Sequence, residues 1–224
     1  MNTIPENSFV ILASGAGSNA RAIASIPELS SRLTAVVSDR KDSRVIKWAG
    51  EAGLAALHAP LKGLSRREAD RTLLDRILPY KPDLVVLAGF MRILGPDFVN
   101  AFAGRIVNIH PSLLPRHPGL GAIERSWEAG DSRLGITIHL VDHGVDTGPV
   151  LAQASISRET FADISDAAHG IHELEHALYP AVVSRLLSRV ASDTGDPARG
   201  SLPYRELQNV LPAHARLEIP AVEV

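Results

Sequence analysis

Five short apolar runs, spaced along the first half of the chain, constrain its fold more than any other feature. Each has four or five residues, contains β-branched side chains and is bounded by turn-forming residues, which is typical of strands buried in a parallel sheet. The runs are Phe9–Ala13, Leu33–Val37, Ala55–His58, Leu84–Ala88 and Ile106–Ile109.

Helix signals lie between these runs. Ser65 and Glu68 have the spacing of a capping box, at the start of a segment with a stripe of Leu and Ile residues. Asp42 can cap a helix that closes at Gly53, and Gly95-Pro96 can open another helix with proline in its first turn. Strands and helices that alternate in this way predict an α/β fold, with a doubly wound, mostly parallel sheet and helices on both faces.

The second half of the chain has a different pattern. The apolar segments Gly135–Leu140 and Val150–Ile156 predict a late strand pair around the turn-rich sequence D-H-G-V-D-T-G-P. Residues 163–190 predict a long C-terminal helix, in which Pro180 must start, break or kink a helix. Residues after Thr194 lack steady periodicity, so we expect a single domain over residues 1–194 and a tail over 195–224.

Composition excludes several classes of function. The 224-residue chain has no cysteine, which removes disulfides, thiolate nucleophiles and cysteine-ligated zinc. Its formal net charge of -2 gives no general attraction for nucleic acid or for an anionic membrane. The first apolar run is too short for a membrane span or a signal sequence. We therefore expect a cytoplasmic protein with small-molecule partners, and neither nucleic acid nor membrane among them.

A glycine-rich sequence, S-G-A-G-S-N, follows the first apolar run. Gly15 and Gly17 allow a tight turn, Ser18 or Asn19 can cap the next helix, and the exposed amides there suit a phosphate. A plain glycine turn is one alternative. A dinucleotide site is another, because the letters fit G-x-G-x-x-A and Asp39 ends the second run where a ribose-binding acid belongs. A nucleotide-triphosphate P-loop is excluded, because no Gly-Lys-Ser/Thr follows.

The last of the five runs ends in two polar residues. Asn108 and His110 share one face of that strand, at the carboxyl end where open α/β sheets place their sites. An amide can stabilise a carbonyl oxygen that becomes negative while an imidazolium donates a proton. A polar strand end bonded to a neighbouring loop is the alternative. Asp142 or Asp146 would favour the charged form of His110 and fix its tautomer.

Two other kinds of site are not expected. His139 and His143 have i,i+4 spacing, but they bridge a strand and a turn and no cysteine is available, so we expect no metal site. The chain also lacks a Gly-x-Ser-x-Gly element, which argues against an α/β-hydrolase triad.

Four segments, taken in order, resemble one enzyme family. They are S-G-A-G-S-N, A-G-F-M-R-I-L, N-I-H-P-S-L-L-P and H-L-V-D-H-G-V-D-T-G-P-V-L-A-Q. Over residues 9–190 the chain is similar to the phosphoribosylglycinamide (GAR) formyltransferases, the folate-dependent formyltransferases of purine synthesis. The resemblance implies direct formyl transfer from 10-formyltetrahydrofolate to the GAR amine, without a metal or covalent intermediate, in a monomer or homodimer.

The resemblance also implies roles for individual residues. Asn108, His110 and Asp146 would form the catalytic centre. The GAR-binding residues would be Gly17, Ser18 and Asn19 for the phosphate and Glu175 for the ribose hydroxyls. Folate would meet Arg67, Met91, Arg92, Ile93, Leu94, Asn108, Asp142 and Asp146. Without the resemblance, Met91 and Ile93 would be assigned to the core and Glu175 to a solvated helix face, and Arg66 could replace Arg67.

One segment departs from the family pattern. After H-P-S-L-L-P the family usually continues Gly-x-His-x-His, whereas residues 119–123 read G-L-G-A-I. Two histidines near the substrate are missing, which leaves room for a different acceptor. Sugar-nucleotide formyltransferases are one alternative within the family. The methionyl-tRNA branch is less consistent, since the residues after Thr194 are too few for its RNA-binding domain. A dinucleotide-binding oxidoreductase and a non-catalytic ligand-binding domain are the alternatives outside it.

Overall fold

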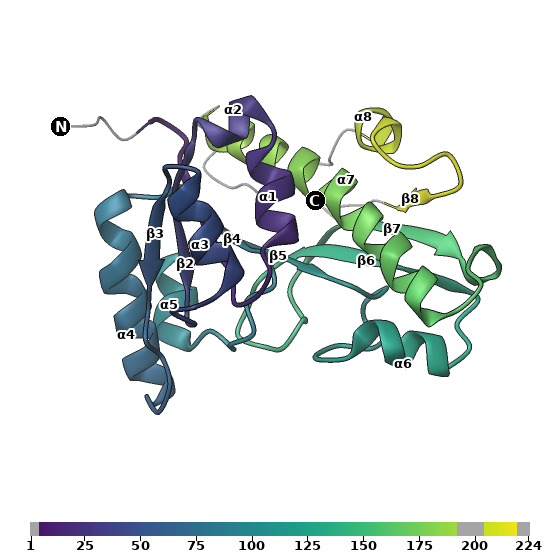
Figure 1. Cartoon of the computed structure of the whole chain (residues 1–224), viewed down its shortest axis with the longest axis horizontal. Coiled ribbons are helices and arrows are strands. Elements are labelled where there is room, and N and C mark those ends of the chain that lie inside the picture. The colour runs from purple at the N-terminus through teal and green to yellow at the C-terminus, as the bar shows by residue number, and fades with distance from the viewer. Residues whose placement is uncertain (1–4, 192–203, 219–224) are drawn as a thin grey trace.

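The structure is a computed structural model that describes residues 5–191 and 204–218. Its strands form one sheet in the order β3-β2-β1-β4-β5-β6-β7-β8, and the first five of these pair in parallel (Figure 1). The strands are β1 (Phe9–Leu12), β2 (Leu33–Ser38), β3 (Ala55–His58), β4 (Leu84–Leu87), β5 (Ile106–His110), β6 (Arg133–Leu140), β7 (Val150–Ser157) and β8 (Arg216–Glu218).

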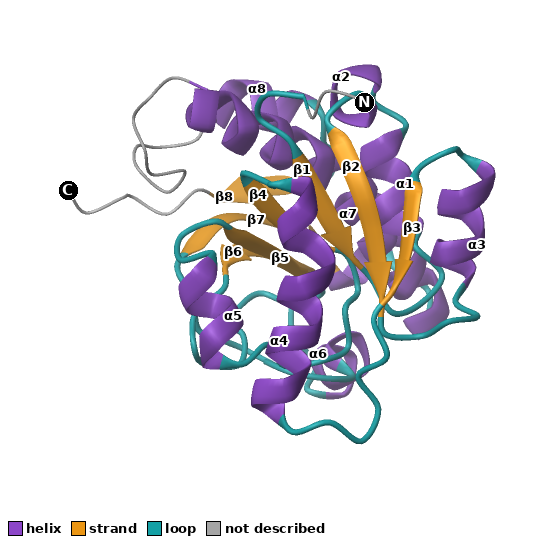
Figure 2. Ribbon diagram, turned by 90° about the vertical axis from the view of Figure 1, so that its left-hand side faces the viewer, coloured by secondary structure: helices purple, strands orange, loops and turns teal. Residues whose placement is uncertain are grey.

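Helices cover both faces of the parallel part of the sheet (Figure 2). They are α1 (Ser18–Ala24), α2 (Pro27–Ser30), α3 (Arg44–Glu51), α4 (Arg66–Ile77), α5 (Pro96–Ala101), α6 (Ala122–Glu128), α7 (Ile164–Ala191) and α8 (Tyr204–Asn209), with 3-10 turns η1 (Leu78–Tyr80) and η2 (Arg158–Thr160). Helices α1, α3 and α7 share one core with the sheet, and α4 and α5 share the other. The predicted α/β fold class is confirmed.

Strand β1 shows why the apolar runs are continuous. Phe9 and Ile11 pack into the core beneath α7, while Val10 and Leu12 pack into the core beneath α4. Both faces are therefore buried, and no position along the strand is left for a polar side chain. Each such side chain contributes about 1.5–3 kcal/mol by leaving water.

Two of the predicted helix starts agree with the structure, and the one at Asp42 does not. The capping box is formed, since Glu68 N–H donates to Ser65 Oγ at 3.3 Å and Ser65 N–H donates to Glu68 Oε2 at 2.8 Å. Helix α5 begins after Gly95, with Pro96 in its first turn. The prediction that Asp42 caps the next helix is wrong. The N-cap of α3 is Ser43, because Asp42 lies within a turn closed by a bond from Ser43 N–H to Arg40 O of 3.2 Å.

The second half contains the predicted strand pair and long helix. Strands β6 and β7 are antiparallel, and β6 is also antiparallel to β5. Helix α7 continues through Pro180, so that residue neither starts nor breaks a helix. Strand β8 pairs with β7 at the edge of the sheet. The predicted boundary after residue 194 lies outside the described residues, so the division into domain and tail stays a prediction.

Helix α7 fixes the strand ends that carry the site. The hydroxyl of Tyr179, which is fully buried, shares its proton between the carbonyls of Leu87 at 2.8 Å and Val107 at 3.0 Å. Burial holds the pKa of Tyr179 well above its usual value, so this hydroxyl stays neutral and donates. The carboxyl end of β4 and the part of β5 directly before Asn108 are thereby held to the same helix.

Candidate active site

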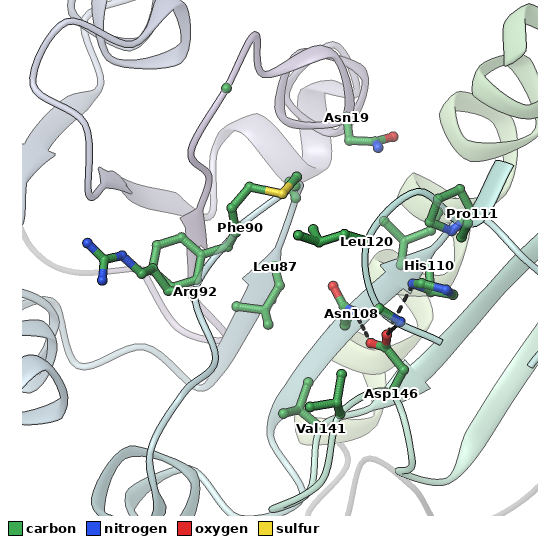
Figure 3. Close-up of a pocket in the computed structure, with 18 of the residues that line it drawn as sticks. Asn19, Leu87, Phe90, Arg92, Asn108, His110, Pro111, Leu120, Val141 and Asp146 are labelled. Carbon is green, nitrogen blue, oxygen red and sulfur yellow. Dashed lines mark hydrogen bonds and ion pairs between the residues drawn. The ribbon is translucent and has the colours of Figure 1, made fainter. Parts of the chain in front are cut away.

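A cavity of about 570 Å³ opens at the carboxyl ends of β1, β4 and β5 (Figure 3). The glycine loop lines one part of it, residues 87–94 another, and β5, the 119–122 segment and the 139–146 segment the rest. Asn19 and Arg92 lie at different sides of this space. Its size and position are those of a ligand site at the edge of an open α/β sheet.

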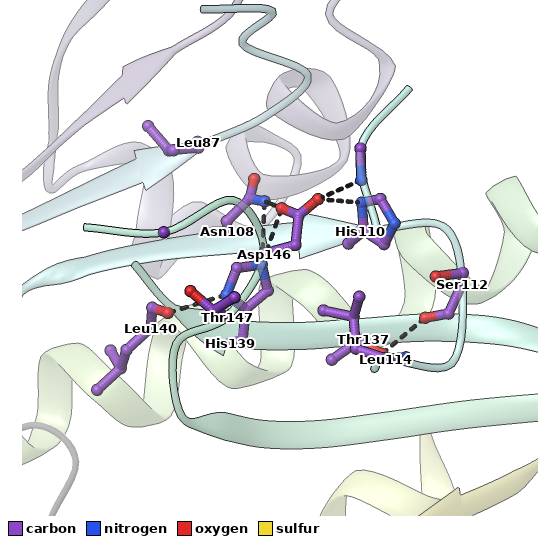
Figure 4. Close-up of polar contacts among 12 residues, drawn as sticks. Leu87, Asn108, His110, Ser112, Leu114, Thr137, His139, Leu140, Asp146 and Thr147 are labelled. Atoms are coloured by element: carbon purple, nitrogen blue, oxygen red, sulfur yellow. Dashed lines mark hydrogen bonds and ion pairs between the residues drawn. The ribbon is translucent and has the colours of Figure 1, made fainter. Parts of the chain in front are cut away.

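His110 and Asp146 meet at the base of this cavity (Figure 4). Nδ1 of His110 lies 3.3 Å from Oδ2 of Asp146, and both side chains are largely buried. Asp146 has a φ of 54°, in the left-handed region that few non-glycine residues adopt, and its Oδ2 also accepts from Gly119 N–H at 2.8 Å. A third candidate residue thus joins the Asn–His pair, and it is Asp146.

Asp146 is a carboxylate throughout the neutral range. Its contact with the His139 ring, the bond from Gly119 N–H and the charge of His110 lower the pKa of Asp146 to about 2, against an opposing effect of burial. An ionised carboxylate only accepts hydrogen bonds, so Asp146 acts as an acceptor for the rings around it.

Both nitrogens of His110 face acceptors. Nε2 lies 2.9 Å from the carbonyl oxygen of His117, which can only accept, so Nε2 carries a proton. Nδ1 faces the Asp146 carboxylate. A neutral ring has one N–H and can satisfy only one of these contacts, whereas the imidazolium satisfies both. The two contacts thus match a ring that donates from both nitrogens, as an acid catalyst would.

His139 also belongs to this cluster, although its spacing from His143 raised only the question of a metal ligand. It is buried, and its Nε2 lies 3.1 Å from Asn108 Nδ2 and 3.6 Å from Asp146 Oδ1. His143, its supposed partner, is exposed and does not line the cavity. The antiparallel register that sets Asn108 opposite His139 brings the two together. The sequence placed His139 in a predicted strand. Only the pairing of β5 with β6 shows that it lies beside Asn108.

The glycine loop and Glu175 form the end of the cavity beside α7. The N-cap of α1 is Gly17, with a φ of 77°, so the predicted capping by Ser18 or Asn19 is wrong. The Asn19 side chain instead donates from Nδ2 to Glu175 Oε2 at 2.9 Å, and its Oδ1 is buried without a partner. Glu175 is buried, so the solvated interpretation fails. His172 donates to the same carboxylate at 3.0 Å, which raises the pKa of His172.

The segment Met91–Leu94 lines the opposite side of the cavity. Met91 is 56% exposed and Ile93 54% exposed, so their assignment to the core is wrong, while Leu94 is buried. Met91 N–H donates to Ser14 Oγ at 2.9 Å, which ties this segment to the glycine loop. The structure thus leaves an apolar surface open on the side predicted for folate.

Arg92 changes the interpretation of Asp39. Its Nε pairs with Asp39 Oδ2 at 3.3 Å, and Asp39 does not line the cavity. A dinucleotide bound here would lack the ribose-binding carboxylate that the sequence offered. The loop is left as a phosphate site or a simple turn.

Two predicted folate residues are less well placed. Arg67 pairs with Asp97 at 3.5 Å, is exposed and does not line the cavity. The stem of the adjacent Arg66 lies beside Gly95, nearer the apolar segment. Asp142 does line the cavity, but its Oδ1 accepts from Thr147 Oγ1 at 2.7 Å and from Gly144 N–H at 3.0 Å, bonds that lower the pKa of Asp142. Asp142 therefore shapes the loop that presents Asp146.

The segment without the two histidines also borders the cavity. Gly121, with a φ of 68°, is the N-cap of α6, and Leu120 is exposed at the cavity surface. Apolar and glycine residues thus occupy the positions where the resemblance leads one to expect imidazoles. Residues 119–123, all of which the structure describes, contribute no histidine to the cavity.

Comparison with known proteins agrees with this geometry. A family model described as formyl transferase matches residues 7–183. The chain is 41% identical to a phosphoribosylglycinamide formyltransferase of Escherichia coli (strain K12), covering 79% of this chain and 85% of that protein. It is 36% identical to that of Bacillus subtilis (strain 168), covering 80% and 94%. The crystal structure of the phosphoribosylglycinamide formyltransferase from Bacillus halodurans superposes with a TM-score of 0.76 at 36% identity, covering 81% and 96%. This chain belongs to the formyl transferase family.

Proposed function

We propose that this protein is a phosphoribosylglycinamide formyltransferase, which transfers a formyl group from 10-formyltetrahydrofolate to the GAR amine in de novo purine biosynthesis. The observation that carries this proposal is the position of Asn108, His110 and Asp146 in one cavity, between a glycine loop and an exposed apolar segment. Its relatives of 41% and 36% identity bear this name over most of their length.

The two ends of the cavity suit the two substrates. The GAR phosphate would lie on the amides of Gly17, Ser18 and Asn19, and the carboxylate of Glu175 would accept from the ribose hydroxyls. The folate would cover the apolar surface of Met91 and Ile93, with Arg92 and Leu94 beside it. Burial of that surface by a ligand would supply about 25 cal/mol per Å².

The chemical step requires no covalent enzyme intermediate. The GAR amine attacks the formyl carbon, and a new C–N bond forms as the carbonyl electron pair moves to oxygen. Asn108 and the His110 imidazolium stabilise this oxyanion. Collapse of the intermediate breaks the bond to N10 of the folate, and the proton that the amine loses is delivered to N10 through His110 or an ordered water. Asp146, 3.3 Å from Nδ1 of His110, stabilises the imidazolium while the oxyanion forms.

Asn108 must turn its amide for this role. Its Nδ2 faces His139 and Asp146, which leaves the acceptor end of the amide for the cavity. A half-turn about the last side-chain torsion presents the N–H groups to the formyl oxygen and sets Oδ1 against Nε2 of His139. The contact with His139, 3.1 Å from the amide, therefore bears on which end of Asn108 meets the substrate.

Location and assembly are part of the same proposal. Among residues 5–191 and 204–218, no helix is both long and apolar enough to cross a bilayer. We expect the enzyme in the cytoplasm, as a monomer or homodimer, with no nucleic acid or membrane partner. Sedimentation of the purified protein at several concentrations distinguishes the two assembly states.

A formyl-transfer assay tests the function. Purified protein is mixed with GAR and a 10-formyl folate, and binding of NAD(H) and NADP(H) is measured in parallel. We expect saturable transfer to GAR and no tight dinucleotide binding. A sugar-nucleotide amine serves as the second acceptor, because the 119–123 segment lacks the two histidines. Transfer to that amine alone, or tight dinucleotide binding without transfer, would overturn the proposal.

A further inference from the structure

One short segment between β5 and α6 holds both partners of the catalytic ion pair. The carbonyl of His117 accepts from His110 Nε2 at 2.9 Å, and Gly119 N–H donates to Asp146 Oδ2 at 2.8 Å. Because His117 and Gly119 are two residues apart, a shift of this segment moves the supports of His110 and Asp146 together.

A second histidine–carboxylate pair anchors the segment outside the cavity. Nε2 of His117 lies 2.9 Å from Oδ2 of Asp131, and Arg116 pairs with the other oxygen of that carboxylate. Asp131 is buried and does not line the cavity. From α6, Arg125 Nη2 donates to the His117 carbonyl at 3.0 Å. The carbonyl that meets the catalytic ring is therefore fixed from its own side chain and from α6.

The backbone of His117 needs this anchoring. Its φ is 55°, and Pro118 follows it, although non-glycine residues seldom adopt the left-handed region and a following proline disfavours helical backbone. Such conformations persist where surrounding contacts over-determine them, often beside active sites. Among the described residues, Asp146 is another non-glycine residue with positive φ, so both contacts of His110 come from such positions.

We infer that Asp131 is a positioning residue for formyl transfer: by holding the His117 ring, it keeps the His117 carbonyl on Nε2 of His110 and so keeps both ring nitrogens of His110 protonated. The kinetic part of this inference rests on the proposed function. Its structural part concerns the ligand-free protein and can be tested without turnover.

The groups around His110 show why loss of Asp131 has a specific result. They are Asp146 from the β6–β7 connection, His139 from β6, His117 from the anchored segment, Arg125 from α6, and His172 and Glu175 from α7 across the cavity. Asp146 and its Gly119 bond do not depend on the Asp131 carboxylate directly. Removing that carboxylate should loosen the His117 carbonyl at Nε2 of His110, although Arg125 and Ser112 still donate to it, and it affects Asp146 only through the bond from Gly119.

The test compares Asp131→Asn, His117→Gly and their double variant with the parent. Glycine adopts the left-handed backbone readily, so His117→Gly removes the ring without adding backbone strain. Asp83→Asn is the control, since Asp83 accepts from Ser8 N–H at 2.9 Å beyond the opposite end of β4. Ring-¹⁵N spectra at neutral pH report whether each nitrogen of His110 carries a proton. In the same proteins, kcat and both KM values are measured across pH.

We expect protons on both ring nitrogens in the parent and a population without the Nε2 proton in Asp131→Asn and His117→Gly. In these variants kcat should fall about tenfold with both KM values nearly unchanged, and the alkaline limb of the rate profile should move to lower pH. The double variant should be no worse, because both changes act through one carbonyl. Asp83→Asn should change stability alone.

Unchanged ring spectra and an unchanged alkaline limb in both single variants would overturn the inference, whatever happened to stability. If the parent failed to formylate GAR, the proposed function would fall, and the ring spectra would still decide the role of Asp131.

Discussion

Two regions of the cavity differ in how far their side chains are already paired or buried. One is the polar centre, formed by Asn108, His110, His139 and Asp146, and the other is the apolar wall, formed by Met91–Leu94. In the centre the side chains are mostly buried, and each is within hydrogen-bonding or ion-pair distance of another. In the wall, Met91 and Ile93 are more than half exposed. The protein completes one region by itself and leaves the other to be completed by a ligand.

This difference follows from the physics of the two tasks. Stabilising a developing charge requires donors and acceptors that are already oriented, since reorienting them during the reaction would raise the barrier. Apolar recognition gains its free energy when surface leaves water, so that surface must be exposed beforehand. Substitutions in the centre should therefore affect turnover, and substitutions in the wall should affect binding.

The largest expected effect is that of Asp146→Asn, which removes the charge beside His110 and keeps its shape. We expect kcat/KM at neutral pH to fall by about 10²–10⁴-fold, with the alkaline limb moved to lower pH. Rate profiles across pH for the parent, Asp146→Asn and His110→Ala measure this. Asp83→Asn, which changes a carboxylate outside the cavity, is the control. If Asp146→Asn left both kcat/KM and the alkaline limb of its pH profile unchanged, Asp142 would become the candidate partner of His110.

In the apolar wall, Ile93→Glu should weaken folate binding and leave the chemistry intact. Loss of an apolar contact and burial of a carboxylate should raise the KM for the folate by at least about tenfold, the equivalent of 1.4 kcal/mol. The KM for GAR should stay near that of the parent, and the fold should survive because Ile93 is already exposed. Ile26→Glu, at an exposed isoleucine outside the cavity, is the control. Equal losses for both substrates would contradict the assignment of this wall to folate.

The free energy of unfolding in acid should reveal the contribution of Asp146, a member of the polar centre. The pKa of Asp146 is about 2 in the folded protein against an ordinary value of 3.8, so its stabilising contribution is complete above about pH 4. That contribution, about 2 kcal/mol, is lost as pH falls toward the folded pKa. Denaturant unfolding of the parent between pH 5 and pH 2 should show this loss, and Asp146→Asn should show a flatter dependence. If the free energy of unfolding fell equally with pH in both proteins, this contribution of Asp146 would be refuted.

The smallest expected effect is on GAR binding at the glycine loop, where Gly15 and Gly17 differ in the space that a side chain would have. A Cβ on Gly17 would lie 2.5 Å from Val45 Cγ2, and its φ is 77°, so Gly17→Ala should destabilise the fold itself. A Cβ on Gly15 meets nothing within 4 Å. Gly15→Ala should therefore raise the KM for GAR a few-fold by obstructing the phosphate, with normal stability and an unchanged KM for the folate. A larger change in the folate KM would place the phosphate elsewhere.

The parallel half of the fold could be predicted because its strands are buried on both faces. Apolar runs of this kind have few other interpretations, and Ala55–His58 matches β3 residue for residue. Helix caps were less certain, since Asp42 and Ser43 offer equivalent side chains and only the turn decides between them. Local pattern therefore identifies the elements better than it identifies their ends.

The site residues that were misjudged depend on contacts distant in sequence. Glu175 is buried because Asn19, 156 residues earlier, donates to it. His139 joins the centre through the register of two strands. Met91 and Ile93 have the composition of a core, and a surface that binds an apolar ligand cannot be told from a core by composition alone. The family resemblance predicts roles for the residues that spacing alone left undecided.

The order of the strands also sets the distance between two parts of the site. The glycine loop follows β1, and Asn108 and His110 lie at the end of β5, with β4 between the two strands. If the glycine loop holds the acceptor phosphate, as proposed, two strand spacings, about 10 Å in all, separate that phosphate from the proposed point of amine attack. An acceptor must be long enough to bridge that gap, whatever its middle looks like. A short amino phosphate would bind at the anchor and never reach the formyl carbon, so the sheet itself excludes it by length.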